Sequence, residues 1–164
     1  TFDETMELAG GADNVVASVY MRIEGDINGN MYFILSLSHA TRFVNQMTGS
    51  NQFSFDHSFD DEISLSALTE LGNILSGSYL SALSDFTGMK IYPSVPLLGI
   101  DMVGALLGYG LLEFSQVGDY AIIIDTDLTE SDSKEEKDVN GHFFLLPDPE
   151  SFDTLFSTLG VKME

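Results

Sequence analysis

A carboxylate and an amide lie one helical turn apart within the segment Ser64–Phe86. If this segment is a helix, steps of four, three and four residues place four positions in one narrow stripe: Ser66, Glu70, Asn73 and Gly77. The carboxylate can anchor a cationic group of a partner, and the amide, which both donates and accepts hydrogen bonds, can orient a water molecule. An amide that aligns water with a phosphoryl group is a known route to phosphoryl hydrolysis, where positioning supplies most of the catalysis. The alternative is a solvated helix face, as most polar helical stripes are.

The same segment carries an apolar seam that predicts packing against a core. Its members recur at alternating three- and four-residue steps, with Gly72 filling the remaining place: Leu65, Leu68, Leu75, Tyr79, Ala82 and Phe86. Glycine inside a helix costs about 1 kcal/mol relative to alanine. We therefore expect close packing of another element at Gly72, and close approach of a ligand or partner at Gly77.

The charge of the chain limits its partners. Twenty-six acidic residues against six basic ones give a net charge of −20 over 164 residues. This balance argues against nucleic acid, which requires clusters of Lys and Arg, and favours a partner that presents cationic groups. The absence of cysteine excludes disulfides and thiol nucleophiles, and it is compatible with the cytoplasmic location that we expect.

One segment, Ser94–Phe114, has the length of a membrane span and a pair of small residues, Gly104 and Gly108. Pro96 and Asp101 argue against a span, because a carboxylate near a bilayer centre costs about 2.5–3.5 kcal/mol. A short buried helix over Leu98–Leu107 is the better interpretation.

The remaining pattern predicts an α+β fold with antiparallel strands and amphipathic helices. We expect strands at Asn14–Glu24, Met31–Leu37, Lys90–Val95, Gly118–Leu128 and His142–Leu146, and helices from Ser38 to Gly49 and from Asp148 to Gly160.

Two segments, Asn28–Gly49 and Asn140–Gly160, share Asn-Gly, an apolar strand, a helix cap, an amphipathic helix and a closing glycine. A duplicated unit is the simplest account. It predicts a single domain of two pseudo-symmetric repeats, residues 1–59 and 60–164, with long helices packed on the sheet. The first repeat lacks a counterpart of Ser64–Val95, so we expect that counterpart upstream of Thr1.

Familiar enzyme motifs are absent: there is no phosphate-binding glycine loop, no nucleophile elbow and no pair of histidines at metal-ligand spacing. We assign no role to the histidines and expect no metal of the chain's own.

In these residues the sequence resembles the CheC family of chemotaxis phosphatases, within the group that includes CheX and FliY. That family is marked by Asp or Ser, three residues, Glu, two residues, Asn, twenty-two residues and Pro. All three spacings are met by Ser66, Glu70, Asn73 and Pro96. The similarity extends over the GDINGN hairpin and the C-terminal strand and helix, and so covers nearly the whole chain.

The resemblance implies removal of the phosphoryl group from the aspartyl-phosphate of the response regulator CheY. Glu70 would pair with a lysine of the regulator, and Asn73 would enter its site and orient the attacking water. Ser66 and Pro96 would be structural members of the motif. Magnesium would belong to the partner receiver domain. CheC-type proteins usually carry two such sites, and the helix that bears the first is not in this sequence.

CheC-type proteins also bind the receptor deamidase CheD. The apolar helix after Pro96 would be the docking surface, with Asp101 as a contact at its rim; the alternative is that this helix fills the core. The rival function is a non-catalytic adaptor that binds CheD or the phosphorylated regulator. The two functions differ at Asn73, whose amide matters for hydrolysis but little for binding.

Overall fold

The computed structural model describes residues 2–49, 51–55, 61–114, 122–128 and 139–161. It confirms the predicted α+β fold with an antiparallel sheet. The strand order is β3-β1-β2-β6-β5, and β4 also pairs with β1. The strands are β1 (Val15–Gly25), β2 (Gly29–Ser36), β3 (Ile91–Pro93), β4 (Leu97–Met102), β5 (Ile122–Leu128) and β6 (Val139–Pro147).

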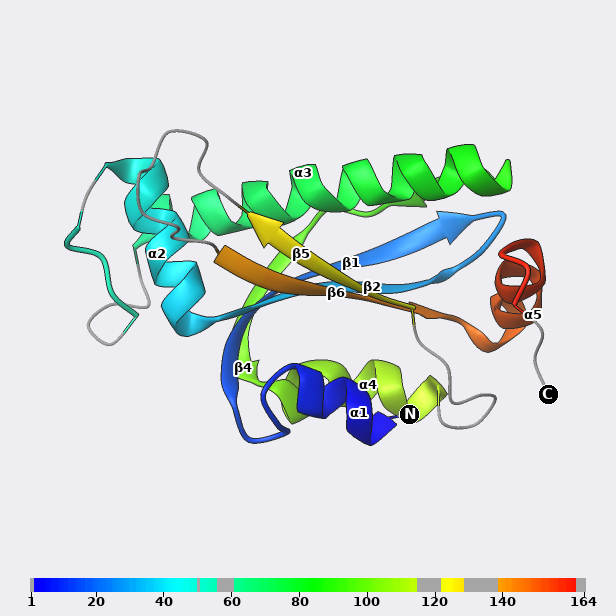
Figure 1. Cartoon of the computed structure of the whole chain (residues 1–164), viewed down its shortest axis with the longest axis horizontal. Coiled ribbons are helices and arrows are strands. Elements are labelled where there is room, and N and C mark those ends of the chain that lie inside the picture. The colour runs from blue at the N-terminus through cyan, green and yellow to red at the C-terminus, as the bar shows by residue number, and fades with distance from the viewer. Residues whose placement is uncertain (1, 50, 56–60, 115–121, 129–138, 162–164) are drawn as a thin grey trace.

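Helices cover both faces of this sheet (Figure 1). The long α3 lies along one face, α1 and α4 lie on the other, and α2 and α5 lie at opposite ends. The helices are α1 (Phe2–Leu8), α2 (Leu37–Thr48), α3 (Glu62–Thr87), α4 (Val103–Phe114) and α5 (Pro149–Thr158). Helix α1 was not predicted from the sequence; its Thr5 is buried, as is Ala9 just beyond its end.

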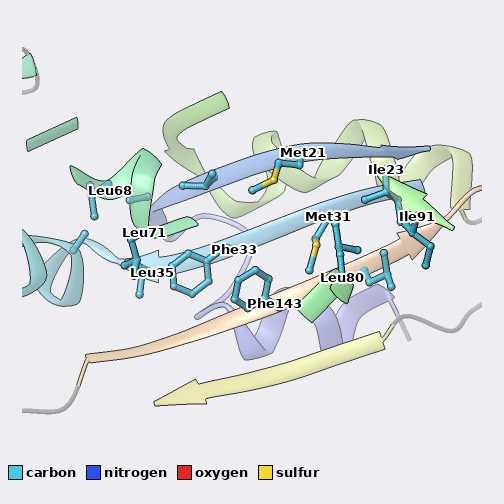
Figure 2. Close-up of a cluster of buried hydrophobic side chains, with 14 of the residues drawn as sticks. Met21, Ile23, Met31, Phe33, Leu35, Leu68, Leu71, Leu80, Ile91 and Phe143 are labelled. Atoms are coloured by element: carbon cyan, nitrogen blue, oxygen red, sulfur yellow. The ribbon is translucent and has the colours of Figure 1, made fainter. Parts of the chain in front are cut away.

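Burial on both faces explains why β2 is a continuous apolar run. Met31 and Phe33 join the core under α3, whereas Tyr32 and Ile34 join a second cluster on the face of α1 and α4. In the first core, shown in Figure 2, the rings of Phe33 and Phe143 stack with centroids 4.6 Å apart. The central strands are thereby fixed from both sides.

The predicted helix over Leu98–Leu107 is wrong in its first half. Residues Leu97–Met102 form β4, which pairs with β1 from Val15↔Met102 to Tyr20↔Leu97. The free edge of β1 offers backbone partners to this segment, so sheet pairing overrides its helical pattern. Helix α4 begins only at Val103, whose N–H donates to the Asn14 carbonyl at 2.9 Å.

Pro96 lies in the break between β3 and β4. Between the pairs Ile23↔Pro93 and Tyr20↔Leu97, the three residues 94–96 lie opposite only two residues of β1, 21 and 22. This extra residue makes the break a β-bulge. Ser94 bridges the gap, because its N–H donates to the Arg22 carbonyl at 2.7 Å and its Oγ accepts from the Arg22 N–H at 3.0 Å. A bulged edge tolerates proline, which has no N–H to donate.

Helix boundaries agree with the prediction at Gly49, where φ is 67°, and at Asp148, the N-cap of α5. The predicted cap at Ser38 is wrong by two residues. Ser36 is the N-cap of α2, and its Oγ accepts from the His39 N–H at 3.2 Å. The predicted strand Gly118–Leu128 is observed from Ile122, and residues 118–121 lie outside the described part.

The pairing register of β2 with β6 can be compared with the alignment of the two predicted repeat segments. The offset that places Asn28 on Asn140 also places Gly29 on Gly141 and Leu35 on Pro147. These residues pair crosswise, as Gly29↔Pro147 and Leu35↔Gly141. An internal twofold through the pair Tyr32↔Phe144 would produce this register. The division into repeats of residues 1–59 and 60–164 stays a prediction.

The membrane alternative considered for Ser94–Phe114 gains no support. Within the described segments, no helix combines the length and hydropathy needed to cross a bilayer.

Candidate functional site

Helix α3 presents the stripe because its opposite side is held against the sheet. Its buried residues are Ser64, Leu68, Leu71, Gly72, Ser76 and Leu80. The predicted seam holds for Leu68 and Gly72, and Leu65, Leu75 and Tyr79 also pack on this core. It is wrong at its end, where Ala82 is exposed and Phe86 is 74% exposed. Leu80 is the last fully buried residue of α3, and Leu83 still packs on the core, so the buried side of the helix continues through Leu83 rather than through Ala82 and Phe86.

The stripe itself faces away from the core. Ser66, Glu70 and Asn73 are all exposed, and within the described part no atom beyond the neighbouring backbone of α3 lies within 4 Å of the position that a Gly77 Cβ would occupy. Among the described residues, the side chains of Glu70 and Asn73 have no hydrogen-bond partner. Both groups are therefore available to a partner, about 4.5 Å apart along the helix axis.

An open depression runs beside the stripe, between α3 and β4. It is lined by Glu62, Leu65, Ser66, Thr69, Glu70 and Leu98. Leu65 and Leu98 give it an apolar floor, because both pack onto the core beneath. The Thr69 hydroxyl is already used, as it donates to the Leu65 carbonyl at 2.8 Å. With respect to the described residues, the polar groups of this surface without a hydrogen-bond partner are thus the carboxylates of Glu62 and Glu70 and the Ser66 hydroxyl.

Pro96 does not line the depression, although it bears on its shape. It is half-buried in the bulge, two residues before Leu98. The bulge sets where β4 starts, and hence where Leu98 meets the first turns of α3. Of the four motif residues, the structure places Ser66, Glu70 and Asn73 on one helix face, with Pro96 in the neighbouring strand break.

Asp101 is separate from this site. It is exposed on β4 rather than on a helix, and its Oδ1 accepts from the Met102 N–H at 2.8 Å. It pairs with Val16, whose side chain belongs to the cluster on the face of α1 and α4. Since directly paired residues share a face, Asp101 lies on the face opposite to α3.

Among the described residues, the histidines and acids do not gather into a metal centre. Across the described ranges, no group of three or more His, Asp or Glu side chains is placed to hold an ion. His39 Nδ1 lies 2.9 Å from the Asn140 carbonyl and His142 lies on β6, while His57 is outside the described residues.

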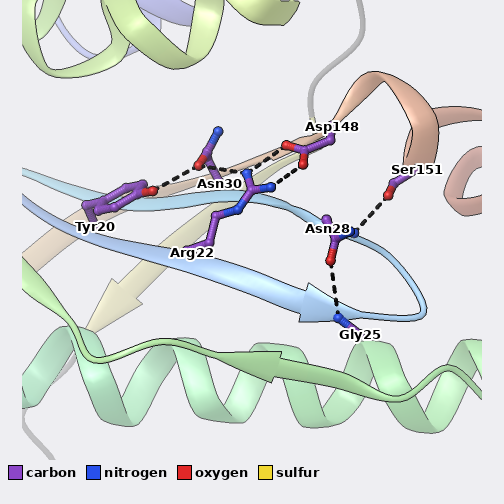
Figure 3. Close-up of polar contacts among 7 residues, drawn as sticks. All are labelled: Tyr20, Arg22, Gly25, Asn28, Asn30, Asp148 and Ser151. Carbon is purple, nitrogen blue, oxygen red and sulfur yellow. Dashed lines mark hydrogen bonds and ion pairs between the residues drawn. The ribbon is translucent and has the colours of Figure 1, made fainter.

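Sequence reasoning missed a polar cluster centred on Arg22 (Figure 3). Its guanidinium binds both carboxylate oxygens of Asp148, with Nη1 2.7 Å from Oδ1, and also donates to Asn30 Oδ1 at 3.2 Å. Tyr20 donates to the same Asn30 oxygen at 3.0 Å. Arg22 and Asp148 are 126 positions apart, so no local pattern could pair them. The cluster fastens β1 to the start of α5 and lies outside the stripe.

The fold is that of the chemotaxis proteins FliY and CheX. The structure is similar to Thermotoga maritima FliY, with a TM-score of 0.62 and 16% identity, over 94% of this chain and 75% of that one. It is also similar to a chain of the CheX-CheY-BeF3-Mg+2 complex from Borrelia burgdorferi. There the TM-score is 0.53 and the identity 16%, over 79% of this chain and 75% of the other.

Sequence comparison narrows this group to one family. Residues 63–100, which include all four motif residues, match the CheC-like family. Over 163 residues the chain is 45% identical to the CheY-P phosphatase CheC of Bacillus subtilis (strain 168), covering 99% of this chain and 77% of the relative. The chain belongs to the CheC-like family.

Proposed function

We propose that this chain is a phosphatase that hydrolyses the aspartyl-phosphate of a CheY-type receiver domain. A relative that is 45% identical over nearly the whole chain is a CheY-P phosphatase. One observation in the structure carries the proposal to particular residues: Glu70 and Asn73 stand exposed and without a hydrogen-bond partner among the described residues, one turn apart on a helix fixed to the sheet.

Each of the two side chains has a distinct role in this proposal. Glu70 accepts a charge-assisted hydrogen bond from a lysine beside the phosphorylated aspartate and so holds the receiver domain in register. Asn73 enters the phosphorylation site, where its amide oxygen accepts from the attacking water and its NH₂ donates to a phosphoryl oxygen. Fixing the water in line converts a bimolecular encounter into a positioned attack.

The reaction requires no covalent intermediate on this chain. The water oxygen bonds to phosphorus while the bond between phosphorus and the aspartyl oxygen breaks. The products are the free aspartate carboxylate and inorganic phosphate, which takes both protons of the water. Charge on the phosphoryl oxygens is neutralised on the receiver domain by its own Mg²⁺, in keeping with the magnesium of the CheX-CheY-BeF3-Mg+2 complex. Ser66 and Pro96 have structural roles in this proposal. Ser66 lines the flank of the depression, and Pro96 lies in the break between β3 and β4.

Decay of a phosphorylated receiver domain tests this proposal. With the wild-type chain present, decay should be faster than that of the receiver domain alone. Asn73→Ala should slow the catalysed step about a hundredfold while binding is retained, because only the positioning of water is lost. Glu70→Ala should weaken binding about tenfold, the equivalent of one charge-assisted hydrogen bond.

Asp85→Ala is the matched control. It also removes one exposed carboxylate from α3 but lies 15 positions beyond Glu70, so it should behave as wild type. If the wild-type chain leaves the decay rate unchanged while binding the phosphorylated receiver domain, the chain is an adaptor and the catalytic proposal is wrong.

A second proposal concerns the deamidase CheD. Asp101 and Met102 are exposed at the end of β4, and Met102 is 44% exposed. Because Asp101 lies on the face opposite to α3, a partner bound there leaves Glu70 and Asn73 accessible. Asp101→Ala should weaken retention of CheD on the immobilised chain without changing phosphatase activity. Equal retention of CheD by wild type and Asp101→Ala would contradict the role of this residue.

A further inference from the structure

Two large apolar side chains stand on the outer face of α3 beside Glu70. Ile63 is 70% exposed and Ile74 is 60% exposed. Ile74 follows Glu70 by four residues and Ile63 precedes it by seven, so all three lie on one ridge of the helix. Asn73 lies on the flank of this ridge, about 100° around the helix from Ile74. The ridge therefore combines apolar groups with the proposed catalytic side chains.

The isoleucines are confined to the half of α3 that carries the stripe. Along the same ridge beyond Gly77 the exposed positions are Ser78, Ser81 and Asp85. Isoleucine is a poorer helix former than alanine, leucine or glutamate, and a side chain that is exposed to water adds no packing energy to the fold. The stability of the helix therefore does not explain isoleucine at these two positions. Single exposed apolar residues are ordinary. Ile63 and Ile74 lie about 16.5 Å apart along the helix axis, one on each side of Glu70, so a partner that covers this length of the ridge would bury an apolar side chain on either side of the carboxylate.

We infer that Ile63 and Ile74 are the apolar anchors by which the phosphorylated receiver domain docks on α3; this inference rests on the proposed function. The position of Ile74 next to the proposed catalytic pair identifies the occupant. Ile74 follows Asn73 by one residue and Glu70 by one helical turn, so a protein that brings a phosphoryl group to Asn73 and a lysine to Glu70 must also cover Ile74. Charge agrees with a cationic partner, since Glu70 lies on the ridge, Glu62 directly precedes Ile63, and both carboxylates line the neighbouring depression. The matching surface on the receiver domain is an apolar patch beside a lysine.

The anchors and the catalytic pair then contribute differently to the reaction. Burial of an isoleucine is the same in the bound substrate and in the transition state, so it lowers KM without changing kcat. The amide of Asn73 acts on the water only as the reaction proceeds, so its loss lowers kcat. The salt dependence of binding distinguishes the isoleucine anchors from Glu70. Dissolved ions screen an exposed charge pair, but they do not screen apolar contacts.

Steady-state hydrolysis of a receiver domain phosphorylated by acetyl phosphate tests the inference. Ile74→Ala and Ile63→Ala should each raise KM about five- to tenfold, the loss expected from one partly buried aliphatic side chain, with kcat unchanged. The ratio of the KM of Ile74→Ala to the wild-type KM should be the same at low and high salt. The corresponding ratio for Glu70→Ala should become smaller at high salt. Alanine favours the helix, so both variants should keep the wild-type circular dichroism spectrum.

Phe86→Ala is the control, because Phe86 is 74% exposed on the same helix and lies beyond the end of the stripe. It should leave KM unchanged. An unchanged KM in both isoleucine variants overturns the docking role, as does a fall in kcat alone. A shift of Ile74→Ala from dimer to monomer in analytical ultracentrifugation also overturns it, because the occupant would then be a second copy. Failure of the proposed function looks different: no hydrolysis by wild type, with binding still weakened by Ile74→Ala.

Discussion

Gly72 and Val19 are in such close contact that a Cβ on Gly72 would lie 2.6 Å from two carbon atoms of the valine side chain. Val19 belongs to β1, in the middle of the sheet, and both residues are buried. This contact sets how closely α3 approaches the sheet, and one residue later the same helix presents Asn73. The expected reason for a glycine at this position, close packing of another element, is confirmed.

Substitution Gly72→Ala should therefore destabilise the fold. Alanine gains about 1 kcal/mol of helix propensity, but forcing a methyl group into a packed core costs about 1–3 kcal/mol, and here the obstacle is a branched side chain on a central strand. We expect a lower midpoint in urea denaturation, together with reduced phosphatase activity as α3 moves outward. The double variant Gly72→Ala, Val19→Ala should recover stability relative to the sum of the single losses.

Gly77→Ala offers the contrasting case on the same helix. Apart from the neighbouring backbone of α3, no described residue lies within 4 Å of its Cβ position, so the substitution should raise the free energy of unfolding by about 0.5–1 kcal/mol. If a partner approaches the stripe closely, the added methyl group should at the same time lower kcat/KM. A variant that is both more stable and fully active would show that the partner does not approach the backbone at Gly77.

The sequence predicted the elements whose signals are local. Asp148 followed by Pro149 gave the start of α5, and Gly49 gave the end of α2. The polar stripe was predicted from spacing alone, because a helix face follows from the period of 3.6 residues. Its orientation away from the core could be predicted for the same reason, since the apolar positions lie opposite.

Features that depend on pairing with distant residues were not predictable. The segment Leu97–Met102 has a helix-compatible apolar pattern and becomes β4 only because β1 has a free edge. Phe86 continued the seam by type and spacing, yet the last residues of α3 that contact the core are Leu80 and Leu83, and Phe86 is exposed. The depression beside Glu70 likewise required Leu98, whose position depends on the bulge at Pro96.

The ion pair between Arg22 and Asp148 should contribute measurably to stability. Their side chains are 32% and 23% exposed, and the guanidinium binds both carboxylate oxygens. Arg22→Lys retains the charge but loses the planar fork, so we expect a loss of about 1–2 kcal/mol in the free energy of unfolding. Asp148→Asn removes the charge while keeping a favourable N-cap residue.

A double-mutant cycle of these two substitutions isolates the pair. Their combined loss should be smaller than the sum of the single losses, because either change alone breaks the same contact. Additive losses in urea denaturation would mean that Arg22 and Asp148 stabilise the fold independently.

The two Asn-Gly segments make equivalent contacts across the centre of the sheet. The Asn28 N–H donates to Ser151 Oγ at 2.8 Å, and the Asn140 N–H donates to His39 Nδ1 at 3.2 Å. Ser151 and His39 each lie three residues after a helix N-cap, Asp148 and Ser36. Each contact thus joins the first turn of one helix to the start of the strand that leads to the other helix, in keeping with an internal twofold.

These equivalent contacts should differ in energy, because the one between Asn28 and Ser151 is part-buried, whereas the one between Asn140 and His39 is exposed. Ser151 is 7% exposed, so Ser151→Ala leaves the Asn28 N–H without its acceptor and should cost about 1–3 kcal/mol. The contact of His39 is exposed to solvent, and water can replace the imidazole after His39→Ala, so the loss there should stay below about 0.5 kcal/mol. Urea denaturation of both variants measures the difference. Equal losses would show that burial does not decide the strength of these contacts and that the two halves of the sheet are energetically equivalent as well as similar in geometry.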